Sequence, residues 1–227
     1  MNLRIFDSLE DLSRALARLI VAETAKREAT VIGISGGSTP RHLYEILGRD
    51  PILADRVVTW VVIDERFVPP DDPQSNASMI RSTLFPNGIS PRHRFLEFDT
   101  TLADAESAAA AFREAHSELQ LDLAILGVGE DGHTASLFPD TSVLGVEDVV
   151  AAAVYVPRLS QWRVTLTMPV IRSAGMKIVQ AAGESKAAIM REIASGADVP
   201  VVRATAGEGT TWWFIDRRCD PTHALND

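Results

Sequence analysis

VVTWVVI, at residues 57–63, is the stretch that decides the fold. All of its residues except Thr59 are hydrophobic, so both faces of the strand that it predicts are suited to burial. Strands of this kind are typical of parallel sheets that helices cover on both sides. A second apolar run, LDLAIL at residues 121–126, has the same character and leads into a glycine-rich turn. Both runs therefore place loops at the ends of buried strands.

Outward from these runs, helix-like and strand-like segments alternate. Ser8 is a predicted N-cap, with Asp11 three residues on, for the first helix. The predicted helices are 9–27, 40–47, 76–84, 102–119 and 185–193, and the further strands are 30–34, 149–156, 163–167, 177–181 and 211–215. This alternation predicts a single α/β domain over residues 1–227, with a doubly wound, mostly parallel sheet and helices on both faces. Residues 217–227 are expected to form a loose tail.

The composition excludes several classes of protein. With 46% hydrophobic and 23% charged residues, the 227-residue chain is typical of a globular protein. Its net charge of -9 argues against a nucleic-acid or anionic membrane partner. The one cysteine, Cys219, cannot form an internal disulfide, which fits a reducing compartment. Because there is also no signal peptide, and no apolar run of the roughly 18 residues that a membrane helix needs, we expect a cytoplasmic protein.

The loop SGGSTP, at residues 35–40, lies between a predicted strand and a predicted helix. Glycines let backbone N–H groups approach an anion, and a helix N-terminus adds partial positive charge. One interpretation is a phosphate cradle made by Gly36, Gly37 and Ser38. The other is a tight turn in which Ser38 or Thr39 is the helix N-cap. The loop is not a Walker loop, because no lysine follows the glycines.

Charged residues follow other predicted strands. Arg66 could bind a phosphate or carboxylate in a forked geometry, and Asp64 could act as a base or orient a neighbour. Arg158 follows the strand at 149–156, and Lys186 lies at the start of a predicted helix. The alternative for each of these residues is a solvated surface charge or a surface ion cluster.

The turn GVGEDG, at residues 127–132, matches the G-x-G-x-x-G pattern of dinucleotide-binding loops. We reject that interpretation, because Glu130 and Asp131 would put negative charge where a pyrophosphate should lie. The turn also lies in the middle of the chain rather than in an opening β-α-β unit, and no acidic residue ends a convincing strand about 20 residues on.

His133 follows Asp131 by two residues in this turn. A histidine beside a carboxylate is suited to general acid–base chemistry, and the alternative is a structural hydrogen bond. The two residues do not make a metal site by themselves. The chain has five histidines and no H-E-x-x-H pattern, so no metal is expected.

Taken together, these loops resemble the 6-phosphogluconolactonase family. The matching stretches, in the family's order, are SGGSTP (35–40), DERFVPPDDPQSN (64–76), LGVGEDGHTASLFP (126–139), RVTLTMPVI (163–171), GESKA (183–187) and TTWWFID (210–216). The related glucosamine-6-phosphate deaminases share several of these loops on a modified Rossmann-like fold. Arg66, where the deaminases usually carry an aromatic residue, and the continuation HTASLFP after Gly132 both favour the lactonases. PRLSQW, at 157–162, departs from the family's Lys-Pro-Pro-rich segment, although Arg158 keeps a positive charge.

The resemblance implies hydrolysis of 6-phospho-D-glucono-1,5-lactone to 6-phosphogluconate, in the oxidative pentose phosphate pathway. His133 would activate water as the base, and Asp131 would orient it. The substrate-binding residues would be Gly36, Gly37 and Ser38 with Arg66 and Lys186 at the phosphate, Asp64 and Asn76 near the sugar hydroxyls, and Arg158. No metal or organic cofactor is expected, because a lactone is already an activated acyl group. The expected partner is the phosphorylated sugar lactone alone, bound by a monomer or weak homo-oligomer.

Two other functions stay open at this point. The first is an aldose–ketose isomerase or deaminase of an amino-sugar phosphate, in which Asp64 would move a proton at C2 and His133 would help to open the ring. The second is a non-catalytic sugar-phosphate sensor. A sensor predicts an attached DNA-binding segment, which we do not expect in an acidic chain whose first predicted helix starts at residue 9.

Overall fold

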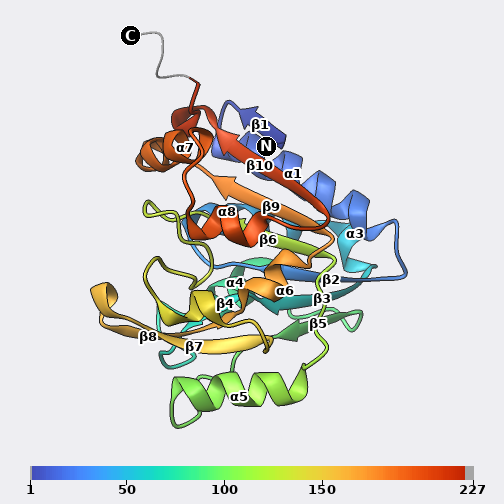
Figure 1. Cartoon of the computed structure of the whole chain (residues 1–227). Helices are drawn as coiled ribbons and strands as arrows, with labels where there is room; N and C mark the ends of the chain where they lie inside the picture. The colour runs from blue at the N-terminus through green and yellow to red at the C-terminus, as the bar shows by residue number, and fades with distance from the viewer. Residues whose placement is uncertain (1, 223–227) are drawn as a thin grey trace.

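A parallel sheet forms the centre of the molecule. In the computed structural model, which describes residues 2–222, seven strands pair in the order β1-β10-β9-β6-β2-β3-β5 (Figure 1). All adjacent pairs in this sheet are parallel. The strands are β1 (Asn2–Phe6), β2 (Ala29–Ile34), β3 (Val57–Val62), β5 (His93–Leu96), β6 (Leu123–Gly127), β9 (Met176–Ala181) and β10 (Thr210–Asp216). The predicted α/β fold with a mostly parallel sheet is confirmed.

Helices cover both faces of this sheet, as predicted. On one face, apolar residues of α1, α2, α3 and α4 pack with Trp60, Ile125 and Phe214. On the other face, α6, α7 and α8 pack in a second core with Leu126 and Val179. The helices are α1 (Leu9–Thr24), α2 (Ser38–Leu47), α3 (Pro51–Ala54), α4 (Asn76–Leu84), α5 (Ala105–Ala115), α6 (Met168–Arg172), α7 (Ala187–Ala194) and α8 (Pro200–Thr205). The sheet thus has a buried apolar layer on each side.

The order of the strands is doubly wound. From β2 the chain adds β3 and β5 toward one edge, then returns to β6 beside β2 and adds β9 and β10 toward the other edge. The direction of winding therefore switches between β2 and β6. In sheets of this kind, ligands bind in the crevice beyond the carboxyl ends of the strands at such a switch point. The loops that start at Ser35 and Val128 lie at this position.

A second, antiparallel sheet was not predicted. It consists of β4 (Asp64–Arg66), β8 (Gln161–Leu166) and β7 (Ala151–Val156), in that order. The turn η2 (Pro157–Leu159) joins β7 to β8, and this connection is too short for a parallel crossover. The sheet lies between the parallel sheet and α5, which packs against β7 and β8 (Figure 1). No strand was predicted at Asp64–Arg66, because three residues are too few to show a strand pattern.

Other elements were missed or misplaced. The edge strand β1 is largely exposed and so carries no hydrophobic alternation, although it pairs with β10 along its whole length. β5, α3, α6 and α8 are likewise short elements that were not predicted. The tail expected from residue 217 is wrong at its start: Arg217–Cys219 form the 3-10 turn η4, and Cys219 is fully buried. Residues 223–227 lie outside the described part of the chain.

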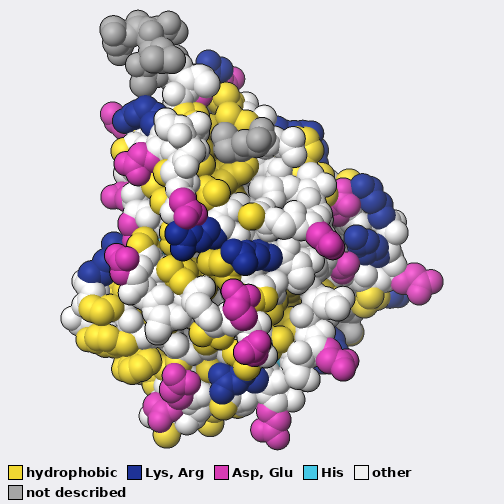
Figure 2. Space-filling model, in the orientation of Figure 1, with side chains coloured by type: hydrophobic (Ala, Val, Ile, Leu, Met, Phe, Trp, Pro, Cys, Tyr) yellow, Lys and Arg dark blue, Asp and Glu magenta, His cyan; other side chains and the backbone are white. Residues whose placement is uncertain are grey.

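The surface carries charges of both signs. Figure 2 shows acidic and basic side chains interspersed, and a gathering of hydrophobic side chains at the free end of the β7–β8 hairpin. Tyr155, Leu159 and Trp162, on or beside this hairpin, are each more than 40% exposed. None of the helices between residues 2 and 222 is both long and apolar enough to span a bilayer.

Candidate active site

A cavity of about 200 Å³ opens beyond the carboxyl ends of β2, β3, β6 and β9. Its wall includes eight of the ten residues predicted for the site: Gly36, Gly37, Ser38, Asp64, Arg66, Asn76, His133 and Lys186. A ninth, Asp131, is hydrogen-bonded to the ring of His133, and the tenth, Arg158, forms an ion pair with Asp131. Loops that are distant in the sequence are therefore brought together at the switch point of the sheet.

His133 is held by the turn that carries it. Its ring Nδ1 is hydrogen-bonded to Oδ1 of Asp131, and its backbone N–H donates to the same oxygen over 3.2 Å. The backbone N–H of Gly129 donates to the carbonyl of His133 over 2.8 Å. A Cβ at Gly129 would overlap the His133 ring, and Gly132 has a φ of +77°, so both positions favour glycine. The glycines thus shape a turn that positions the imidazole of His133. They do not form a dinucleotide-binding loop.

Asp131 is ionised at neutral pH. Partial burial acts to raise its pKa, but the hydrogen bond and charge of His133, together with the charge of Arg158, outweigh burial and lower the pKa to about 2. A carboxylate can only accept hydrogen bonds, so Nδ1 of His133 carries the proton of this bond. In the neutral form of the ring, a proton on Nδ1 leaves Nε2 with its lone pair, as a general base requires.

Arg158 contacts Asp131 and not the cavity. Its Nη2 lies 2.6 Å from Oδ2 of Asp131, and its guanidinium lies 4.8 Å from the centre of the Phe138 ring. The ring of His133 stacks on the same Phe138 ring, with 4.1 Å between the two ring centroids. Arg158 therefore lies against Asp131 and Phe138, and its guanidinium holds the Asp131 carboxylate in place.

The loop 35–40 begins α2 without a side-chain cap. Gly37 is the N-cap, with a φ of +115°, and within the described chain no side chain bonds to the N–H groups of the first turn. The interpretation of Ser38 or Thr39 as N-cap is therefore wrong, because the helix already begins at Ser38. A Cβ at Gly36 would overlap the side chain of Asn76. The uncapped start of α2 lies on the cavity wall, where it suits an anion.

Two arginines face one another beside this helix start. Arg66 on β4 and Arg163 on β8 are register partners in the antiparallel sheet. Like charges that lie directly opposite in a sheet destabilise it, so this pair favours an anion between them. Burial, with the charge of Arg66 contributing, lowers the pKa of Arg163, while Asp64, 3.9 Å away, acts against this. Arg163 was not predicted as a site residue, and only the pairing of β4 with β8 reveals it.

The acidic pair after β3 has two different structural tasks. Glu65 is buried and accepts backbone N–H bonds of 2.7 Å from both Asn76 and Ala77, so it fixes the start of α4. Burial raises the pKa of Glu65, although these N–H bonds oppose the shift. Asp64 accepts a 2.7 Å hydrogen bond from the hydroxyl of Ser136. Asn76 donates to the backbone carbonyl of Asp64 over 2.7 Å, which holds its amide at the cavity wall.

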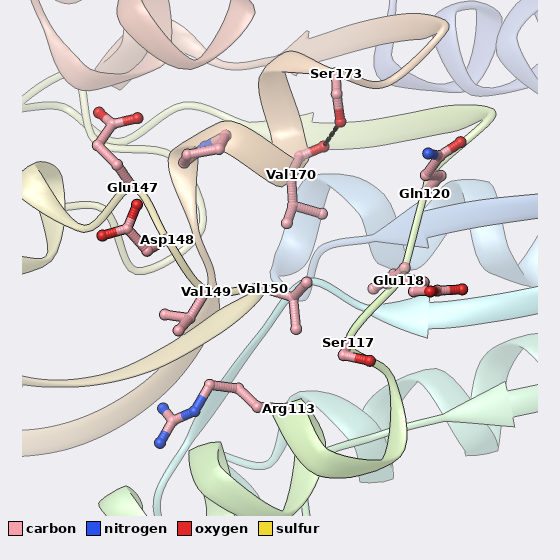
Figure 3. Close-up of a pocket in the computed structure, with 12 residues that line it drawn as sticks. Arg113, Ser117, Glu118, Gln120, Glu147, Asp148, Val149, Val150, Val170 and Ser173 are labelled. Atoms are coloured by element: carbon pink, nitrogen blue, oxygen red, sulfur yellow. Dashed lines mark hydrogen bonds between the residues drawn. The ribbon is translucent and has the colours of Figure 1, made fainter.

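A larger cavity, of about 890 Å³, lies elsewhere on the molecule (Figure 3). It is bordered by the end of α5, the segment 147–150 and α6, and holds none of the predicted site residues. Arg113 on its wall donates to the carbonyl of Ala151, and Ser173 donates to that of Val170. Two of its polar side chains are thus used within the fold, and size alone does not identify the site. Within residues 2–222, no three His, Cys, Asp or Glu side chains are placed to hold a metal ion.

Comparisons with known proteins agree with this geometry. The profile of the family described as glucosamine-6-phosphate isomerases/6-phosphogluconolactonase matches residues 7–213. The 6-phosphogluconolactonase of Homo sapiens is 32% identical, over 93% of this chain and 90% of its own, and that of Mesorhizobium japonicum is 35% identical over 77% and 76%. The crystal structure of 6-phosphogluconolactonase from Leishmania guyanensis superposes with a TM-score of 0.84, at 27% identity over 100% of this chain and 99% of that one. The chain therefore belongs to the glucosamine-6-phosphate isomerase/6-phosphogluconolactonase family and, within it, to the 6-phosphogluconolactonases.

Proposed function

We propose that this protein hydrolyses 6-phospho-D-glucono-1,5-lactone to 6-phospho-D-gluconate, the lactonase step of the oxidative pentose phosphate pathway. The family membership supports this activity. The single observation that carries it is the pairing of His133 with Asp131 at the wall of a cavity that also presents an uncapped helix start, Arg66 and Lys186. A base and an anion-binding surface are what hydrolysis of a phosphorylated lactone needs.

In the proposed reaction, Nε2 of His133 takes a proton from water as the water oxygen attacks the lactone carbonyl carbon. The bond from that carbon to the ring oxygen then breaks, and the imidazolium returns the proton to the leaving oxygen, which becomes a hydroxyl. Asp131 stabilises the imidazolium between these two steps. A base positioned in this way contributes roughly 10²–10⁴-fold to the rate.

The phosphate is held at the start of α2. The backbone N–H groups after Gly37 and the partial positive charge of the helix support this assignment, as do the side chains of Arg66 and Lys186 on the same wall. A chain with a net charge of -9 thus gathers cations around one cavity. Asp64 and Asn76, which also line the cavity, are proposed to lie near the sugar hydroxyls.

Arg158 is proposed to act through Asp131. Its charge helps to keep that carboxylate ionised, and its guanidinium packs on the ring that supports His133. This differs from the direct substrate contact expected from the sequence, and an Arg158→Gln variant separates the two. Loss of kcat at an unchanged KM supports a positioning role, whereas a raised KM supports substrate contact.

Turnover of freshly prepared 6-phosphogluconolactone tests the proposal, measured against the enzyme-free rate because the lactone also hydrolyses spontaneously. The expected result is acceleration that saturates with substrate, and no release of ammonia from glucosamine 6-phosphate. Ammonia release would favour the deaminase function instead. Binding of 6-phosphogluconate with no turnover would favour a sensor.

We further propose that the enzyme works in the cytoplasm as a monomer or weak homo-oligomer. Cys219 supports a reducing compartment, because its buried thiol forms no disulfide within the described residues. Light scattering across a dilution series measures the mass in solution. A mass that stays at that of a larger assembly at the lowest concentration would contradict this expectation.

A further inference from the structure

Gln180 is a buried polar side chain on the wall of the catalytic cavity. It is 1% exposed, and neither its amide oxygen nor its amide nitrogen has a hydrogen-bond partner among residues 2–222. Buried amide groups in proteins are almost always hydrogen-bonded, because an unpaired one forfeits its bonds to water. A group of this kind at a ligand cavity therefore indicates a bond that is made when the ligand is bound.

The position of Gln180 in the sheet gives the direction of its side chain. Gln180 lies near the carboxyl end of β9 and is in register with Gly127 on β6 and Phe214 on β10. Register partners point to the same face of a sheet, and Phe214 packs in the core beneath α1 and α2. The side chain of Gln180 thus projects on the face of the sheet that α2 covers, and α2 contacts β9 directly.

Open space lies beside the amide. Gly127 has no side chain, and a Cβ built there would meet no atom of the described chain within 4 Å. Both Gly127 and Gln180 line the cavity, together with Ser38 at the start of α2. Ser35, on the same wall, is also buried and has a hydroxyl with no partner among the described side chains and backbone groups. This wall therefore has unused polar groups and room for a ligand atom to reach them.

The surrounding charges favour an anionic ligand atom at this position. α2 starts at the cavity with no side-chain cap, and Lys186 comes from the loop that directly follows β9. A carboxamide has two N–H donors, and a phosphoryl oxygen is a strong acceptor. We propose that Gln180 is a phosphate-binding residue, whose amide N–H donates to a phosphoryl oxygen of the sugar phosphate seated at the start of α2. This assignment rests on the proposed function for the identity of the sugar phosphate.

Substitution of Gln180 by Met tests the assignment, because Met keeps the length of the side chain and removes the amide. The Kd values of inorganic phosphate, 6-phosphogluconate and gluconate are measured by calorimetry, and KM and kcat with the fresh lactone. We expect the Kd of both phosphate ligands and the KM to rise about 10-fold or more, as loss of a hydrogen bond to a charged group predicts. The kcat stays within about twofold, since Gln180 does not take part in the proton transfers.

Thr30→Val is the matched control. Thr30, on β2, is also 1% exposed with an unpartnered hydroxyl among the described residues, but it does not line the cavity. Its substitution should leave all Kd and KM values unchanged. Both variants should melt no lower than the wild type, because each removes an unpaired buried polar group. If Gln180→Met fails to fold, Gln180→Leu, which also removes the amide, is measured in its place.

Unchanged phosphate and 6-phosphogluconate affinities in a folded variant would overturn the assignment. So would an equal loss for gluconate, which would place the amide at the sugar, or a wild-type protein that binds neither phosphate ligand. A wild type that binds phosphate through Gln180 but does not hydrolyse the lactone would leave the assignment standing and refute the proposed function. The two claims can therefore fail separately.

Discussion

The carboxylate of Asp131 and the Nδ1 nitrogen of His133 are hydrogen-bonded within one turn, directly after the central strand β6. Because Arg158 binds the other carboxylate oxygen, the pair is anchored on both sides. Because Nδ1 is bonded to Asp131, Nε2 is the ring nitrogen of His133 left for the proposed proton transfers, with Asp131 as the proposed counter-charge. Variants at Asp131, Gly129 and Lys186 test this pair and the phosphate site proposed at the start of α2.

The low pKa of Asp131 predicts how stability depends on pH. Its value of about 2 lies below the ordinary value of 3.8, so ionised Asp131 stabilises the folded protein above about pH 4. That contribution, on the order of 2 kcal/mol, should be lost as the pH falls from about 4 to 2. Chemical denaturation of wild type and Asp131→Asn across this range measures it as the difference in unfolding free energy. The control is Glu130→Gln, which removes an exposed carboxylate from the same turn; an Asp131 difference that stays constant down to pH 2 would contradict the account.

Gly129→Ala should reduce activity and, because it disturbs the Asp131–His133 pair, should also cost part of the stability that this pair contributes. The added Cβ would overlap the ring of His133 and approach Asp131, so the imidazole must move from its position. We expect kcat to fall at least 10-fold, with 6-phosphogluconate affinity nearly unchanged. Gly145→Ala is the matched control, because a Cβ there meets nothing within 4 Å in the described chain. Equal kcat values for the two variants would show that the position of the ring does not matter.

Lys186→Ala should mainly raise KM. Lys186 lies on the cavity wall with the start of α2, and loss of a hydrogen bond from a charged group to the phosphate should raise KM about 10- to 100-fold. The effect should be absent with unphosphorylated gluconolactone as substrate. Lys26→Ala, which removes a lysine paired with Glu23 on the surface, is the control. An unchanged KM for the phosphorylated lactone would remove Lys186 from the phosphate site.

Much of the fold could be predicted because its central strands are apolar on both faces. The runs at 57–63 and 121–126 indicated buried parallel strands, and parallel strands bring their carboxyl ends to one edge of the sheet. The loops after Ile34, Val62 and Gly127 were therefore expected to converge, and they do. The nearness of Asp131 and His133 could also be predicted from the sequence, because two residues of one turn lie close together whatever the tertiary structure.

What could not be predicted depends on pairing between distant segments. Arg163 joins the site because β8 pairs with β4, and three-residue β4 carries no periodic signal. In the sequence, Gln180 is an ordinary polar residue of a strand. Only the structure shows its register with Gly127 and its position on the cavity wall. Arg158 was placed at the substrate because its charge was known and its partner Asp131 was not. Cys219 was assigned to a tail because no local pattern marks η4, where its thiol lies 3.3 Å from the carbonyl of Ala181.

The kcat of a His133→Ala variant, measured together with its affinity for 6-phosphogluconate, tests the central claim most directly. His116→Ala, which removes a histidine at the end of α5, is the control and should behave as the wild type. If His133 is the base, its removal lowers kcat by roughly 10²–10⁴-fold toward the spontaneous rate, while the product Kd changes little. Turnover at the wild-type rate in a folded His133→Ala protein would contradict the account.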